Sequence, residues 1–230
     1  MFASWPCPLP GGKTAQENAR VFDQDRKRRI LVLAPLFDEH NKMRHQLVEV
    51  MQRLDQAGLD SILPDLPGGN ESLEPLQDQS LGSWRTAIEA AAKHWRATHV
   101  LAVRGGGLLA PGGYPGWLYG AVAGKQLLRS MIRARMIAAR EQGREESSEA
   151  LLGTGRTQGL ELAGWSLGPQ MVRDLEESQK PAPETLSLIE HAALGGTPLW
   201  LRAEPDRDAE QADALAGQLS TSLGIAGRTA

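Results

Sequence analysis

Short apolar runs alternate with amphipathic stretches along the middle of the chain. Residues 30–34 and 100–103 contain no polar residue, which is typical of parallel strands buried on both faces of a sheet. Between these runs, the apolar residues from 47 to 54 recur at helical spacing and stop at Gly58. This alternation predicts an α/β fold with a mostly parallel sheet and helices on both faces.

The same pattern predicts the remaining elements. A strand at residues 100–103 is followed by a helix start that Pro111 and two glycines cut short. Further strands are expected at 61–63, 117–122, 159–163, 186–189 and 198–202, and helices at 81–95, 125–141, 169–177 and 208–223.

Two segments show no such periodicity. Residues 1–28 are rich in proline, glycine and charge, and we expect a flexible N-terminal arm with one short helix near residues 14–23. Residues 29–230 are expected to form a single domain. Within it, the helix after residue 124 and the charged, glycine-containing segment up to 157 are expected to form a cap region, the latter part mobile.

Composition excludes several classes of protein. The 230 residues are 41% hydrophobic and 23% charged, as in ordinary globular proteins, and the net charge of -3 does not favour nucleic acid. The single Cys7 excludes an internal disulfide and suits a reducing compartment. No signal peptide is apparent, and no apolar run approaches the ~20 residues of a membrane span. We therefore expect a cytoplasmic protein without a membrane span.

The stretch from 98 to 110 combines a strand, a sharp turn and a helix start, which together form a ligand-facing elbow in open α/β sheets. Gly105, Gly107 and Ala110 match the dinucleotide pattern G-x-G-x-x-A. That pattern needs a full crossover helix and an acidic residue about 20 positions later. Here Pro111 ends the helix and the later region is basic, so nucleotide binding is disfavoured.

A second pattern at the same stretch is the nucleophile elbow, in which small residues flank the tip. Ala102 and Gly106 fit these flanking positions, but the tip is Arg104. A guanidinium stays protonated and is no nucleophile, and it lies at the unfavourable end of the helix dipole. We therefore expect Arg104 to have an anionic ligand or an acidic partner. Candidates at the same sheet edge are Asp38, Glu39, Glu204 and Asp206.

A G-x-S-x-G motif occurs further along the chain, with Ser166 at its centre. The usual order of serine, acid and histidine fails, because His191 is the only histidine after Ser166 and precedes Asp206. Glu184 or Glu190 would have to complete a triad. Ser166 is expected to cap the next helix instead. The alternative is an active ester or thioester hydrolase in which His191 takes the Ser166 proton.

Other polar clusters are weaker signals. The five histidines show no zinc-site spacing, so neither a metal nor a cofactor is predicted. Lys125, Arg129 and Arg133 recur at four-residue steps on one predicted helix face. Such a row is usually a solvated helix face, although it can also meet phosphates or an acidic partner.

Five segments in the same order are similar to one known family. They resemble the exosortase-A-system-associated hydrolase, second type, an α/β-hydrolase-like family linked to bacterial exopolysaccharide and protein-sorting gene clusters. The Asn-Lys-x-Arg loop, residues 41–44, is the most specific part, and the similarity covers roughly residues 30–202. The segments are residues 37–44, 63–68, 104, 124–133 and 162–165.

The resemblance implies an α/β-hydrolase fold, a cytoplasmic setting and a role near exopolysaccharide production. It also implies that residues 164–168 hold no nucleophile. This chain departs from the family pattern at Ala34-Pro35-Leu36, where the family has a double proline. The helix after the elbow is clipped, and the short C-terminal tail lacks histidine.

These observations lead to one preferred hypothesis, which leaves open whether the protein is an enzyme. It is a hydrolase-family protein without a working Ser-His-Asp triad that binds an anionic small molecule or a protein of the exopolysaccharide machinery. The alternative remains hydrolysis by Ser166 and His191. The expected ligand-binding residues are Glu39, Asn41, Lys42, Arg44 and Arg104.

Overall fold

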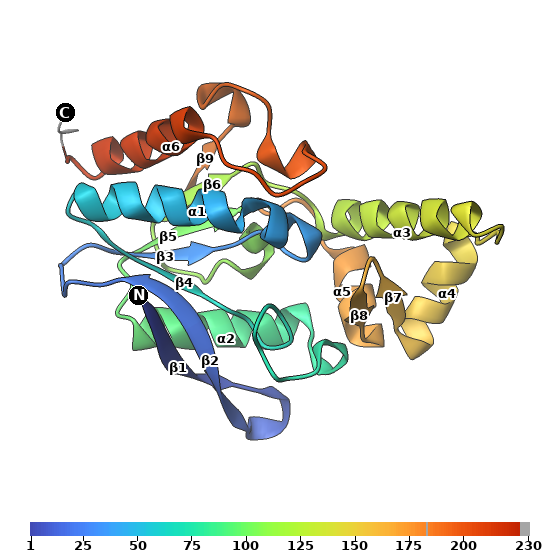
Figure 1. Ribbon diagram of the computed structural model, residues 1–230. Helices are drawn as coiled ribbons and strands as arrows, with labels where there is room; N and C mark the ends of the chain where they lie inside the picture. Colours follow the sequence, from blue (N-terminus) through green and yellow to red (C-terminus); the bar gives the residue numbers. More distant parts are fainter. Residues whose placement is uncertain (183, 226–230) are drawn as a thin grey trace.

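A twisted sheet runs through the centre of the protein in the computed structural model, which describes residues 1–182 and 184–225 (Figure 1). The strand order is β1-β2-β4-β3-β5-β6-β9; β2 pairs antiparallel with both β1 and β4, and the other neighbouring strands pair parallel. The predicted mostly parallel sheet is thus confirmed. The strands are β1 (Phe2–Pro8), β2 (Thr14–Phe22), β3 (Arg29–Leu33), β4 (Asp60–Pro64), β5 (His99–Val103), β6 (Gly116–Tyr119) and β9 (Leu186–Ile189).

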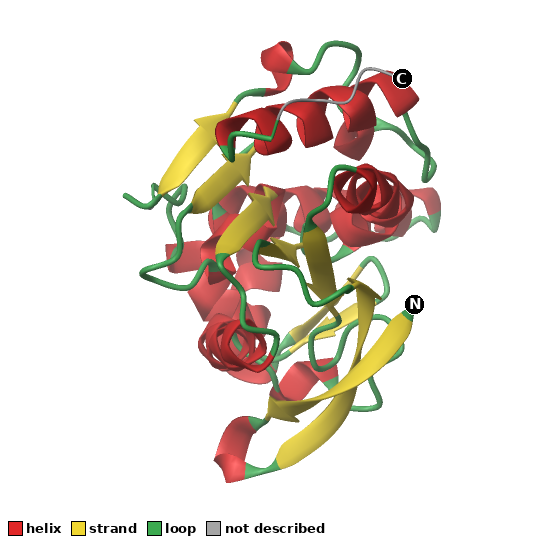
Figure 2. Cartoon of the chain, turned by 90° about the vertical axis from the view of Figure 1, so that its left-hand side faces the viewer, coloured by secondary structure: helices red, strands yellow, loops and turns green. Residues whose placement is uncertain are grey.

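Helices cover both faces of this sheet (Figures 1 and 2). α1 (Asp38–Gln56) and α6 (Ala209–Ser222) pack together on one face, and α2 (Leu81–His94) covers the other. Alternate side chains of β3 pack into the hydrophobic cores on the two faces of the sheet: Ile30 lies in one core and Leu31 in the other. A strand buried on both faces must be apolar throughout, which explains the unbroken hydrophobic runs.

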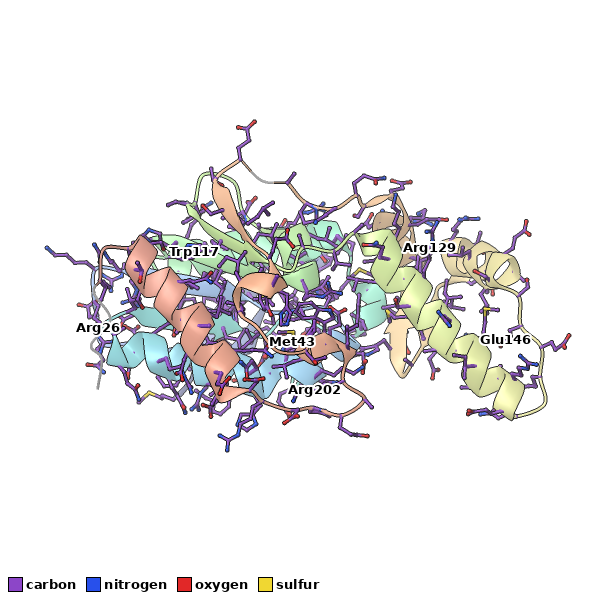
Figure 3. All side chains as sticks on the ribbon, turned by 90° about the horizontal axis from the view of Figure 1, so that it is seen from above. Arg26, Met43, Trp117, Arg129, Glu146 and Arg202 are labelled. Carbon is purple, nitrogen blue, oxygen red and sulfur yellow. The ribbon has the colours of Figure 1, made fainter. Side chains whose placement is uncertain are left out.

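A cap region is inserted between β6 and β9 and projects from the sheet (Figures 1 and 3). In Figure 3, Glu146 marks the turn at its far end. The cap consists of α3 (Gly124–Glu141), α4 (Ser148–Gln158), the β7–β8 hairpin (Leu160–Leu162 and Trp165–Leu167) and α5 (Pro169–Glu177). Short 3-10 helices are η1 (Pro10–Gly12), η2 (Leu76–Asp78), η3 (Arg104–Leu109), η4 (His191–Ala193) and η5 (Leu199–Leu201).

The prediction of a flexible N-terminal arm is wrong. β1 and β2 form a hairpin whose second strand pairs with β4, so this segment belongs to the sheet. Trp5, Cys7 and Ala19 are fully buried and alternate with exposed residues along the two strands. This period-two pattern is present in the sequence, but the prolines and charges around it obscure it.

One further expectation fails toward the C-terminal part. Residues 198–202 were expected to form a strand, but they contain η5, with Leu201 exposed. The cap segment predicted to be mobile contains α4, which begins at a Ser147 cap whose hydroxyl accepts from the Ala150 N–H. Gly155 of this helix packs closely on Val172 of α5, since a Cβ built on the glycine would lie 3.1 Å from that valine. Within the described residues, no helix is long and apolar enough to cross a bilayer.

Candidate functional site

The elbow after β5 has the geometry that its small flanking residues predict. Arg104 adopts a φ of 52°, a left-handed conformation that is costly for a residue with a side chain. Gly106 lets the turn approach β3, because a Cβ there would lie 2.4 Å from the Leu33 and Ala34 carbonyl oxygens. The following helix is the short η3, as expected from Pro111. The elbow therefore presents Arg104 at the carboxyl edge of the sheet.

The Arg104 guanidinium is fixed on three sides. Its Nε and Nη2 donate to the two Glu39 carboxylate oxygens at 3.0 and 2.7 Å, and Nη1 donates to the Gly120 carbonyl at 3.0 Å. The Trp200 ring lies 4.5 Å from its Cζ, within range for a cation–π contact. Both side chains of the ion pair are largely buried, at 15% and 17% exposure, which strengthens the interaction relative to a surface pair.

Glu39 is therefore the acidic partner that the elbow arginine was expected to need. The other proposed acids lie elsewhere: Asp38 pairs with Lys42 at 2.9 Å, Asp206 pairs with Arg202, and Glu204 is exposed. Glu39 reaches Arg104 from the first turn of α1, where its charge also complements the helix dipole.

A polar hollow of about 430 Å³ opens beside this ion pair. It lies between the elbow and α3, at the base of the cap. Arg104 and Lys180 contribute positive charge and Glu39 contributes negative charge, so the hollow carries a net charge of +1. The other lining residues are Ala121, Val122, Gln126, Leu127 and Ser130.

The structure does not gather the five predicted ligand-binding residues into one site. Glu39 and Arg104 meet in the hollow, whereas Lys42 lines an adjacent one beside Asp38. Arg44 points elsewhere, with its Nη1 donating to Asp65 Oδ1 at 2.9 Å. Asn41 is exposed on α1. Lys180 and Trp200 were missed, because nothing in their local sequence indicates proximity to the elbow.

Ser166 and His191 do not form a catalytic pair in the structure. Ser166 is exposed on β8, opposite Glu161 in the cap hairpin, and the helix it was expected to cap begins after Gly168 instead. The ring nitrogens of His191 contact the Tyr119 hydroxyl at 2.7 Å and the Gly196 carbonyl at 3.1 Å. Among the described residues, no hydrogen bond joins His191 to Ser166.

His191 belongs to an aromatic cluster beside the elbow. Because the Gly196 carbonyl can only accept, His191 Nε2 donates to it, and in the neutral imidazole Nδ1 then accepts from the Tyr119 hydroxyl. Burial raises the pKa of Tyr119, which keeps the hydroxyl protonated as the donor. Trp200 packs edge-on against both rings, at 5.5 and 5.3 Å between centroids. This cluster holds the indole that covers Arg104.

A second polar cluster links α1 to the loop after β4. Asp65 is buried and accepts from Arg44 and from Asn70, whose Nδ2 lies 2.6 Å from Asp65 Oδ1. The same two donors lie 3.0 and 3.3 Å from His40 Nε2, so this nitrogen is the acceptor and the imidazole is neutral. Burial, reinforced by the charge of Arg44, lowers the pKa of His40 to about 4. The described residues contain no group of three or more His, Cys, Asp or Glu side chains placed to hold a metal ion.

No protein-family model matches the chain, and no curated protein matches it by sequence. Solved structures do resemble it. A hydrolase-like protein from Agrobacterium vitis S4 is 14% identical with a TM-score of 0.54, covering 96% of this chain and 98% of its own. Est1E from Butyrivibrio proteoclasticus, with ferulic acid bound, is 13% identical with a TM-score of 0.48 over 96% and 98% of the two chains. The chain therefore has the predicted α/β-hydrolase fold.

The His40 environment generates a prediction about acid stability. A histidine whose pKa is about 4 when folded and about 6.5 when unfolded binds its proton mainly in the unfolded state between these values. The stability that the neutral His40 contributes is therefore fully present above pH 6.5 and is lost as the pH falls toward 4. We expect His40→Gln to lose less stability than the wild type between pH 7 and pH 4.5, measured by urea unfolding. Equal losses in the two proteins would contradict this assignment.

Proposed function

We propose that this protein uses its α/β-hydrolase fold to bind a small anionic molecule, with Arg104 as the main recognition group. The observation that carries the proposal is the fixed guanidinium at the elbow tip, beside an open hollow of about 430 Å³. A cation held by Glu39, Gly120 and Trp200 needs little reorganisation to meet a ligand. The arrangement supports binding better than nucleophilic chemistry.

The Arg104 guanidinium has N–H groups left to donate to such a ligand. Of its five N–H groups, three donate to Glu39 and Gly120 within the described part of the chain. Gly120 lies beside the base of the fork, because a Cβ built on it would be 3.3 Å from Arg104 Cδ. The Nη1–Nη2 edge is thus available, and a carboxylate can accept two parallel hydrogen bonds from it. Lys180, exposed and without an ion pair to a described residue, adds a second cation.

The family resemblance adds a biological setting to this proposal. Similarity of residues 37–44 and 63–68 to the exosortase-associated family supports a cytoplasmic role beside bacterial exopolysaccharide production, with a protein of that machinery as a further partner. The exopolysaccharide made by a strain lacking the gene should fall; an unchanged amount would contradict this setting.

Ligand binding is tested with butyrate as the probe, by isothermal titration calorimetry at constant ionic strength. Arg104→Gln should weaken binding by about 10- to 100-fold, because a charged bidentate contact is worth about 1.5–3 kcal/mol. Lys180→Gln, at an exposed position that does not threaten folding, should weaken it by several-fold. Arg129→Gln, an exposed arginine on the same cap, is the matched control and should bind like the wild type (Figure 3). Wild-type affinity in both hollow variants would overturn the proposal.

The absence of serine chemistry is tested with a fluorophosphonate probe. The ring nitrogens of His191 are engaged by Tyr119 and Gly196, so His191 is not placed to activate Ser166. We expect labelling of the native protein to be no greater than that of Ser166→Ala. Labelling that depends on both Ser166 and His191 would favour the hydrolase alternative.

A further inference from the structure

We infer that the anion is an amphiphilic monocarboxylate whose hydrocarbon chain lies along α3, an inference that rests on the proposed function. A second hollow of about 230 Å³ adjoins the polar hollow. Leu127 and Ser130 line both, so the two are neighbours along the same helix. Together they form a groove that is charged at the Arg104 end and becomes apolar along α3.

The lining of the second hollow suits a hydrocarbon chain. Most of its side chains are apolar, and the charges of Asp38 and Lys42 cancel in an ion pair with N–O separation of 2.9 Å. From Leu127 to Ala134 the helix rises by about 10 Å, which gives the groove length for roughly eight carbon atoms. The apolar lining residues are Leu36, Phe37, Leu127, Met131, Ala134 and Ala163.

Phe37 forms a fixed wall of this groove. Its backbone has a φ of 56°, and its ring lies 5.8 Å from both the Trp84 and Trp165 rings. The cavity behind the ring measures only about 30 Å³, too small for a hydrocarbon chain. A bound chain therefore follows α3. A strained, aromatic-braced residue at this edge is the kind of feature that ligand sites retain.

The net charge of the groove favours a ligand that carries one anionic group. Arg104 and Lys180 exceed Glu39 by one positive charge, which one carboxylate neutralises. The planar carboxylate also matches the Nη1–Nη2 edge of the guanidinium. A second anionic group on the chain would have to enter the apolar part of the groove and lose its hydration there. The groove therefore favours a monocarboxylate over a dicarboxylate of the same chain length.

A chain-length series on the full protein tests this inference. Calorimetric Kd values for butyrate, hexanoate and octanoate should improve by about fourfold for each methylene buried, or ~200-fold from butyrate to octanoate. Suberate, with a carboxylate at each end of an eight-carbon chain, should lose most of that gain. If octanoate binds no tighter than butyrate, the groove assignment is wrong while the Arg104 site stands. If neither binds, the proposed function fails as well.

A pair of bulky substitutions locates the chain. Ala134 lines the second hollow but not the first, whereas Ala138 is exposed one turn further along α3 and lines neither. Ala134→Trp should reduce the octanoate-to-butyrate affinity ratio to near one, and Ala138→Trp should leave this ratio as in the wild type. An unchanged ratio in Ala134→Trp, or an equal loss in both variants, would overturn the inference.

Discussion

The site depends on a permanent cation held at the end of a buried parallel strand. β5 is apolar and buried from Val100 to Val103 and is paired with β3 and β6, so the turn after it has little freedom. Gly106 lets this turn approach the β3 backbone, and the tip of the turn, two residues earlier, lies at the carboxyl edge of the sheet. Arg104 stands at that position with a left-handed backbone. The same steric constraints that expose a nucleophile in an enzyme here expose a guanidinium.

The partners of Arg104 explain how this strained cation is retained. Removing a guanidinium from water costs several kcal/mol unless hydrogen bonds and an opposite charge replace the lost hydration. Glu39 supplies the charge, Gly120 supplies a carbonyl, and Trp200 covers the guanidinium face. An ion pair of this kind contributes more to orientation than to net stability. Its consequence is a guanidinium held in one orientation beside the hollow.

Sequence patterns predicted the parts of the protein that local physics determines. Strands buried on both faces, such as β3 and β5, leave unbroken apolar runs, and the elbow is visible from Ala102 and Gly106. The β1–β2 hairpin was missed because its inward residues are few and separated by polar ones, so only pairing with β4 reveals it. The site was predicted in part. Glu39 lies on the helix after a neighbouring strand. Lys180 lines the same hollow and Trp200 contacts Arg104, but no local pattern in the sequence indicates either position.

The path of the chain after β9 determines which side chains lie beside the elbow. β9 is the last strand of the sheet among the described residues, and the chain turns at once into η4 and then η5. This short return places His191 against Tyr119 and Trp200 over Arg104. In an active triad an imidazole with a free nitrogen faces the elbow tip. Here the Trp200 indole covers the tip, and both ring nitrogens of His191 are engaged by Tyr119 and Gly196.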